Sequence, residues 1–179
     1  KSIADMSRVR VPDVHETLQY VFDAIKMIKK ELNGRVPLIG FAGAPWTLLC
    51  YMVQGKGSKT FDEAKSFCYT QPEVAHHLLQ MITDTTISYL KGQIEAGADV
   101  VQIFDSWGGL WSPVDFEEFS LQYIRQIVHA VKDLAPTIIF AKGAWASIGA
   151  IAETGAAGLA IDWGIPPKTA SALAADNRT

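Results

Sequence analysis

Polar and aromatic residues follow each of four short apolar runs in this sequence. The four groups are Trp46 with Tyr51, Asp105–Trp107, Lys142–Trp145 and Asp162–Trp163. The hydroxyl of Ser106 can donate a hydrogen bond to a carboxylate, and the phenol of Tyr51 can do the same. Tryptophans beside these hydroxyls suit a pocket for a large, flat ligand. The residue types therefore predict a binding pocket lined by hydroxyls and aromatic rings.

Each of these polar residues also has a structural interpretation. Asp105 would repel an acidic ligand unless it is paired, so we expect a helix cap or a structural acceptor there. Tyr51 is equally compatible with a phenol that bonds a backbone carbonyl and with one that donates to a substrate. Lys142 and Asp162 are expected to form a charge pair across the pocket mouth. The residues alone leave the two alternatives for Tyr51 open.

The sequence offers no base that would make Ser106 a nucleophile. A reactive serine needs an adjacent base, and the four histidines fall within predicted helices, where we expect surface or packing roles. They are His15, His76, His77 and His129. The two cysteines, Cys50 and Cys68, form neither a disulfide scaffold nor a zinc site, and they indicate a reducing compartment. Serine-hydrolase chemistry is therefore disfavoured.

Four buried strands are predicted to position the polar groups. We expect strands at 36–41, 99–104, 137–141 and 158–161, and helices at 13–33, 45–54, 59–69, 72–97, 112–131, 147–154 and 166–176, with Asp13, Thr70 and Ser112 as N-caps. Apolar strands alternating with amphipathic helices predict a parallel α/β sheet covered on both faces. The absence of Gly-x-Gly-x-x-Gly after a strand disfavours a dinucleotide site. Two folds stay compatible with this pattern, part of a barrel and an open doubly wound sheet. Both folds place the polar groups together at the C-terminal ends of the strands.

Composition limits the function classes. The 179 residues are 49% hydrophobic and 20% charged, which fits a globular protein, but a complete (β/α)8 barrel needs about 250 residues. The net charge of −3 gives no reason to expect nucleic acid or an anionic membrane as partner. No apolar run approaches the roughly 20 residues of a transmembrane helix, and no signal peptide is evident.

Two motifs resemble the signatures of the uroporphyrinogen decarboxylase family. The first is Gly-Phe-Ala-Gly-Ala-Pro-Trp-Thr-Leu at 40–48, continued by Tyr-Met-Val-x-Gly at 51–55, and the second is Gln-Ile-Phe-Asp-Ser-Trp-Gly-Gly at 102–109. The resemblance implies a (β/α)8 TIM-barrel fold. It also implies a homodimer that is located in the cytoplasm and acts in heme and porphyrin biosynthesis. It also implies decarboxylation of the four acetate side chains of uroporphyrinogen III to give coproporphyrinogen III, without metal or other cofactor.

The resemblance assigns substrate-binding roles by position. It implies that Tyr51 and Ser106 hydrogen-bond substrate carboxylates, and that Phe41 and Phe104 line the cleft as pocket walls. The family's arginine-rich loop and its aspartate that faces the pyrrole nitrogens would lie upstream of Lys1, and a substrate-binding histidine beyond Thr179. We therefore expect residues 1–179 to be the central portion of one barrel domain, without N- and C-terminal parts, with no catalytic residue and no activity alone.

Two alternatives remain to be tested. A zinc-dependent corrinoid methyltransferase shares the fold, but its zinc needs His and Cys ligands near strand ends, and both cysteines here fall on predicted helices. A non-catalytic fragment that binds porphyrinogens or a complementary fragment is the other alternative, because part of a barrel leaves sheet edges unpaired. Metal analysis and sizing of the chain would test these two alternatives.

Overall fold

The computed structural model of the chain describes residues 9–175. The elements, in order, are α2 (Val14–Leu32), β1 (Ile39–Gly43), α3 (Pro45–Gln54), α4 (Asp62–Thr70), α5 (Pro72–Glu95), β2 (Val100–Asp105), the 3-10 turn η1 (Gly108–Leu110), α6 (Pro113–Phe116), the π-helical turn η2 (Glu117–Leu121), α7 (Gln122–Val131), β3 (Thr137–Ala141), the 3-10 turn η3 (Trp145–Ser147), α8 (Ile148–Ala152), β4 (Gly158–Ala160) and α9 (Pro167–Ala175). Each predicted strand and helix is present, in the predicted order.

Several element ends differ from the prediction by one to three residues, among them both ends of β1 and β2, the start of α4 and the end of β4. Two of the differences have a clear physical cause. Strand β1 begins at Ile39 rather than 36, because Pro37 has no N–H to donate and the N–H of Leu38 bonds the Asp99 carboxylate at 2.7 Å. Thr70 does not cap α5: it is the last residue of α4, and its hydroxyl donates back to the Ser66 carbonyl at 2.6 Å. A threonine inside a helix commonly makes this bond to the preceding turn.

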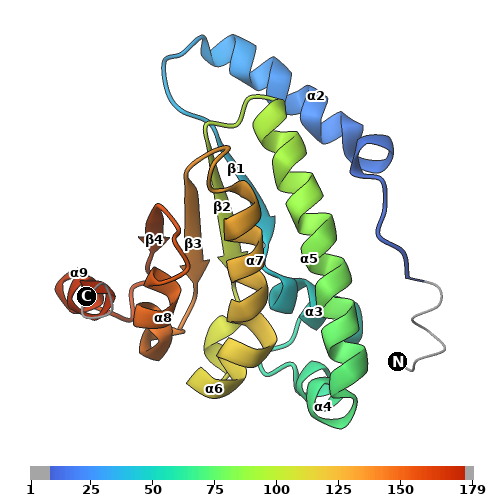
Figure 1. Ribbon diagram of the computed structural model, residues 1–179, viewed down its shortest axis with the longest axis vertical. Helices are drawn as coiled ribbons and strands as arrows, with labels where there is room; N and C mark the ends of the chain where they lie inside the picture. Colours follow the sequence, from blue (N-terminus) through green and yellow to red (C-terminus); the bar gives the residue numbers. More distant parts are fainter. Residues whose placement is uncertain (1–8, 176–179) are drawn as a thin grey trace.

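The four strands form one parallel sheet in the order β1-β2-β3-β4. In register, Phe41 lies beside Gln102 and Phe104 beside Phe140. All four strands run in the same direction, so their C-terminal ends meet at the end of the sheet where α3, α4 and α6 lie (Figure 1). This arrangement confirms the predicted part of a (β/α)8 barrel and brings the polar groups to one end.

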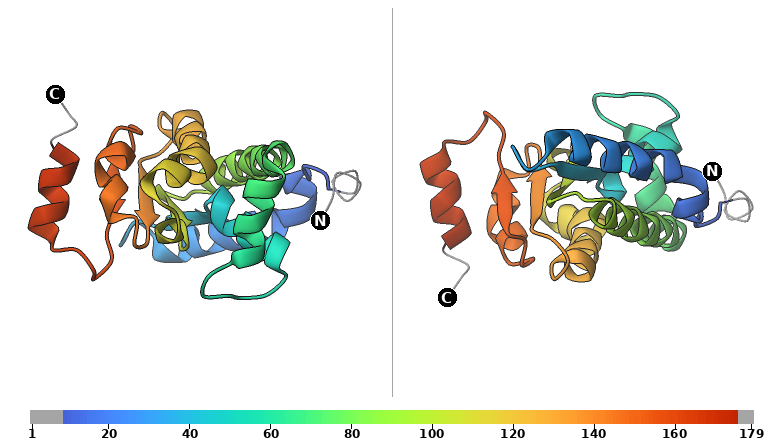
Figure 2. Two further views of the ribbon diagram at one scale, coloured as in Figure 1. Left: turned by 90° about the horizontal axis from the view of Figure 1, so that it is seen from below. Right: turned by 90° about the horizontal axis from the view of Figure 1, so that it is seen from above.

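One face of the sheet carries the core. Helices α5 and α7 lie on the same side of the strands (Figures 1 and 2), and they cover Val101, Ile103 and Ile139, which are all buried. The side chains that alternate with these point to the opposite face, where Ile39 is 49% and Phe41 61% exposed. The prediction that both faces are covered is therefore wrong for the described residues. In a complete barrel, side chains of the other strands fill the inner face, and the four strands described here leave part of that face exposed.

Among the described residues, a glutamine side chain and not a strand bonds the outer edge of β1 at Phe41. Gln93 of α5 is buried, and its amide donates to the Phe41 carbonyl and accepts from the Phe41 N–H, both at 2.9 Å. Gly40 permits this approach, since a Cβ there would lie 2.6 Å from the Gln93 Oε1. A side chain thus makes the two hydrogen bonds that a neighbouring strand would make at Phe41.

Replacing Gln93 by leucine is expected to lower the free energy of unfolding by about 2 kcal/mol, because it leaves the Phe41 N–H and carbonyl without their partner. Chemical denaturation measures the loss. Gln126→Leu is the matched control, since the Gln126 amide is exposed and only accepts a bond from Gln80. Equal stability of the two variants would show that the edge of β1 does not need Gln93.

Candidate functional site

The loops that follow β1, β2 and β3 are joined by backbone hydrogen bonds. The N–H of Ala44 bonds the Phe104 carbonyl at 2.9 Å, and the N–H of Lys142 bonds the Asp105 carbonyl at 3.0 Å. The N–H of Gly109 then bonds the Lys142 carbonyl at 2.9 Å. These bonds hold the candidate site as one surface, so side chains far apart in the sequence keep fixed relative positions.

Asp105 lies beneath this surface and does not face a ligand. Its side chain is fully buried, and its two carboxylate oxygens accept from Thr47 Oγ1 at 2.7 Å and from Ser120 Oγ at 2.5 Å. Burial raises the pKa of Asp105, while the hydroxyls and the N–H of Trp107 act in the opposite direction. The structural-acceptor interpretation of Asp105 is therefore confirmed.

Local backbone features let Asp105 make these contacts. Ser120 belongs to the π-helical turn η2, and a π-turn shifts the side chains of a helix relative to the preceding turn. Gly108 leaves space above the carboxylate, because a Cβ there would lie 2.9 Å from both Asp105 Oδ2 and the ring of Phe116. Sequence reasoning predicted one continuous helix at 112–131 and did not detect this turn.

Trp107 joins Tyr51 to the loop that carries Ser106. Its indole Nε1 donates to the Tyr51 hydroxyl oxygen at 2.9 Å, and Ser106 immediately precedes it in the chain. The Trp107 ring packs against Phe61 with centroids 4.8 Å apart. Tyr51 is 44% exposed and bonds an indole rather than a backbone carbonyl. The structure thus brings Tyr51 and the Ser106–Trp107 loop together, a contact that sequence reasoning did not predict.

A small hollow of about 220 Å³ opens beside Ser106. Its lining comes from the loops after β2 and β3: Ser106, Trp107, Gly109, Leu110, Lys142 and Gly143. Ser106 is half-buried and Lys142 is exposed. The hollow is therefore lined by Ser106, whose hydroxyl suits an anionic group, and by the loop of Lys142 and Gly143.

Three phenylalanines form a row on the open face of the sheet. Phe41 and Phe104 meet edge to face with centroids 5.9 Å apart, and Phe104 and Phe140 do so at 5.7 Å. Sequence reasoning named Phe41 and Phe104 and missed Phe140. The signal was available, since Phe140 has the same place in the third apolar run that Phe104 has in the second.

Lys142 and Asp162 do not form the predicted charge pair. The Asp162 carboxylate accepts from the N–H groups of Gly143 and Gly164, both at 2.7 Å, and from Trp145 Nε1 at 3.0 Å. Burial opposes ionisation, but these hydrogen bonds and the Lys142 charge lower the pKa of Asp162. The Lys142 ammonium lies 5.3 Å from the centre of the Trp163 ring, so the lysine contacts an aromatic face instead.

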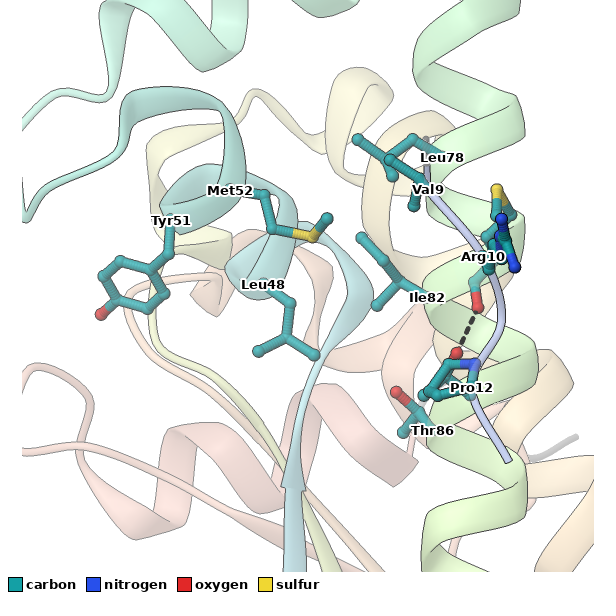
Figure 3. A pocket seen from close by; sticks show the side chains of 11 residues that line it. Val9, Arg10, Pro12, Leu48, Tyr51, Met52, Leu78, Ile82 and Thr86 are labelled. Carbon is teal, nitrogen blue, oxygen red and sulfur yellow. Dashed lines mark hydrogen bonds between the residues drawn. The ribbon is translucent and has the colours of Figure 1, made fainter. Parts of the chain in front are cut away.

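A second, apolar pocket of about 330 Å³ lies between residues 9–12, α3 and α5 (Figure 3). Its lining is Val9, Arg10, Pro12, Leu48, Tyr51, Met52, Leu78, Met81, Ile82, Thr85 and Thr86. The Tyr51 ring lies at its margin with the hydroxyl directed away from the other lining residues (Figure 3). The phenol oxygen therefore bonds Trp107 at the candidate site, while the edge of the Tyr51 ring lines the apolar pocket.

The described residues do not favour a metal centre. No three His, Cys, Asp or Glu side chains within 9–175 are grouped so that they could hold a metal ion. Burial raises the pKa of the Cys50 thiol and raises that of Cys68 to about 12, which opposes metal binding by either thiolate. His76 is packed, stacked on Phe119 at 5.2 Å. Nothing in this region supports the zinc-dependent alternative.

None of the described helices is long and apolar enough to cross a bilayer.

Comparisons with known proteins agree with one another. The family model described as "Uroporphyrinogen decarboxylase (URO-D)" matches residues 1–179. The uroporphyrinogen decarboxylase of Flavobacterium johnsoniae is 56% identical over 179 residues, which are 100% of this chain and 52% of the relative. That of Christiangramia forsetii is 60% identical over 158 residues, covering 88% of this chain and 46% of the relative. The chain spans about half the length of these curated relatives.

Among solved structures, a methyltransferase from Methanosarcina mazei is similar to this chain with a TM-score of 0.80 and 22% sequence identity. The match covers 92% of this chain and 48% of the methyltransferase. At this identity the likeness supports the fold alone.

Proposed function

This chain belongs to the uroporphyrinogen decarboxylase family, and we propose that it forms the central part of a (β/α)8 barrel that decarboxylates uroporphyrinogen to coproporphyrinogen. The observation that carries the proposal is the hydrogen bond from Trp107 to Tyr51 at 2.9 Å. It places a half-exposed phenol beside the loop of Ser106, at the end of the sheet where α/β enzymes bind their ligands.

The proposed roles follow from what each side chain offers. Tyr51 and Ser106 donate hydrogen bonds to carboxylates of the substrate. Phe41 and Phe104 supply an apolar wall against which a tetrapyrrole ring can pack, because Phe41 is largely exposed and continues the aromatic row. A ligand with an apolar ring system and several carboxylates fits both features.

The reaction needs a proton donor as well as binding groups. Protonation of a pyrrole carbon makes the ring a cation, which accepts the electron pair when the bond between the acetate methylene and its carboxyl carbon breaks. Carbon dioxide leaves, and the methylene carbon takes up a proton to become a methyl group. The proton first added to the ring carbon is then lost, which restores the pyrrole. General acid catalysis and charge stabilisation near the ring are required. We assign no residue of this chain to the proton transfer, and we propose that other segments of the barrel supply it.

The 179-residue chain is expected to show no turnover of uroporphyrinogen alone. A chimaera, in which residues 1–179 replace the matching segment of the Flavobacterium johnsoniae relative, is expected to form coproporphyrinogen, because the segments are 56% identical. Porphyrin products are measured by chromatography after oxidation. Turnover by the chain alone would refute the first expectation, and a folded but inactive chimaera would refute the proposed function.

Two further properties are proposals from the family resemblance. We propose a homodimer, which sedimentation of the chimaera tests, and a cytoplasmic location. Two buried free cysteines fit a reducing compartment.

A further inference from the structure

The hydroxyl of a tyrosine can donate or accept a hydrogen bond, and its neighbours decide which it offers to a ligand. An indole N–H can only donate. Trp107 Nε1 lies 2.9 Å from the Tyr51 oxygen, so in this pair the phenol is the acceptor. The proton of the phenol must then point to another acceptor.

The position of Trp107 is set by groups other than Tyr51. The buried Asp105 carboxylate accepts from its backbone N–H, and its backbone carbonyl accepts from Trp46 Nε1 at 3.1 Å. Its ring packs against Phe61, which is buried. Trp46 is also fully buried. The indole is therefore held in place before any ligand arrives, and a pre-set donor does not have to reorganise on binding.

We propose that Trp107 is a positioning residue that fixes Tyr51 as a hydrogen-bond donor to a carboxylate of the ligand. The indole N–H occupies the accepting side of the phenol oxygen, so the phenol proton is presented outward. Bonds in such a chain polarise one another, so donation from the indole strengthens donation from the phenol. The arrangement selects ionised carboxylates over ligand groups that need an acceptor. The carboxylate as ligand rests on the proposed function, whereas the bond between Trp107 and Tyr51 does not.

Nuclear magnetic resonance of the chain with ¹⁵N-labelled tryptophan tests the bond itself. The resonance of the Trp107 indole is assigned by its loss in Trp107→Phe. In Tyr51→Phe we expect this proton to move upfield, because its acceptor is gone. Tyr20→Phe, which alters an exposed phenol on α2, is expected to leave it unchanged. An indole proton that does not respond to Tyr51→Phe would overturn the proposal, whether or not a ligand binds.

Titration with uroporphyrin, the stable oxidised form of the proposed substrate, tests the consequence. Tyr51→Phe and Trp107→Phe are each expected to weaken binding about tenfold, the size of one hydrogen bond to a charged group, and the double variant no further. Trp107→His, which keeps an N–H donor, is expected to recover part of the affinity. If Trp107→Phe weakens binding equally with and without the Tyr51 hydroxyl, the indole acts independently and the proposal fails. A wild-type chain that does not bind uroporphyrin contradicts the role of Tyr51 in this chain as a donor to a ligand carboxylate. The chimaera still decides the proposed function, and the indole resonance decides the bond between Trp107 and Tyr51.

Discussion

Replacing Asp105 by alanine is expected to lower the free energy of unfolding by about 4 kcal/mol. The carboxyl side chain is fully buried, so its removal leaves a cavity. It also leaves the hydroxyls of Thr47 and Ser120 without their hydrogen-bond acceptor. Each buried polar group left unpaired costs about 1–3 kcal/mol. Since the backbone N–H of Trp107 also loses its acceptor, the loss extends to the loop of the candidate site.

Two comparison variants separate this effect from a general loss of charge. Asp105→Asn keeps the shape and one oxygen acceptor, and we expect it to retain more than half of the lost stability. Asp133→Ala removes an exposed carboxylate after α7, and changes at such positions alter stability by at most about 0.5 kcal/mol. Denaturant unfolding measures all three. An Asp105→Ala protein as stable as Asp133→Ala would contradict the structural role of the buried carboxylate.

The order of strands and helices could be predicted because its signals are local. Apolar runs such as 99–104 alternate with helical periodicity, and Asp13 accepts from the N–H groups at the start of α2 as its sequence position predicts. The parallel sheet and the strand-end position of the site follow from that order. The inner face could not be predicted as open, because an apolar strand pattern is the same whether helices or other strands cover it.

The contacts within the site depend on residues far apart in the sequence. Tyr51 and Trp107 are 56 positions apart, and Gln93 and Phe41 are 52 apart. No local pattern encodes such pairs. The predicted charge pair of Lys142 with Asp162 was wrong for a related reason. The prediction considered the opposite charges of the two side chains and did not consider backbone N–H groups as donors to the carboxylate. Backbone N–H groups in tight turns also need acceptors, and two of them bond the Asp162 carboxylate.

Replacing Gly109 by alanine is expected to lower the free energy of unfolding by about 3 kcal/mol and to weaken ligand binding more than tenfold. A Cβ at Gly109 would lie 2.7 Å from both the Cα and carbonyl carbon of Gly143 and from the Lys142 carbonyl oxygen. These are backbone atoms, which cannot rotate away as a side-chain tip can, and overpacking of this kind typically costs 1–3 kcal/mol. The two loops must separate, which breaks the Gly109 to Lys142 hydrogen bond.

The chain offers a matched control for this substitution. Gly57 has no atom within 4 Å of an added Cβ and no left-handed backbone, so Gly57→Ala is expected to change stability by at most about 0.5 kcal/mol. Uroporphyrin affinity and denaturant unfolding are measured for both variants. Because the hollow beside Ser106 is lined by the same two loops, their separation moves the hydroxyl of Ser106 away from Lys142. A Gly109→Ala chain that matches Gly57→Ala in both measurements would show that the close packing of these loops does not maintain the site.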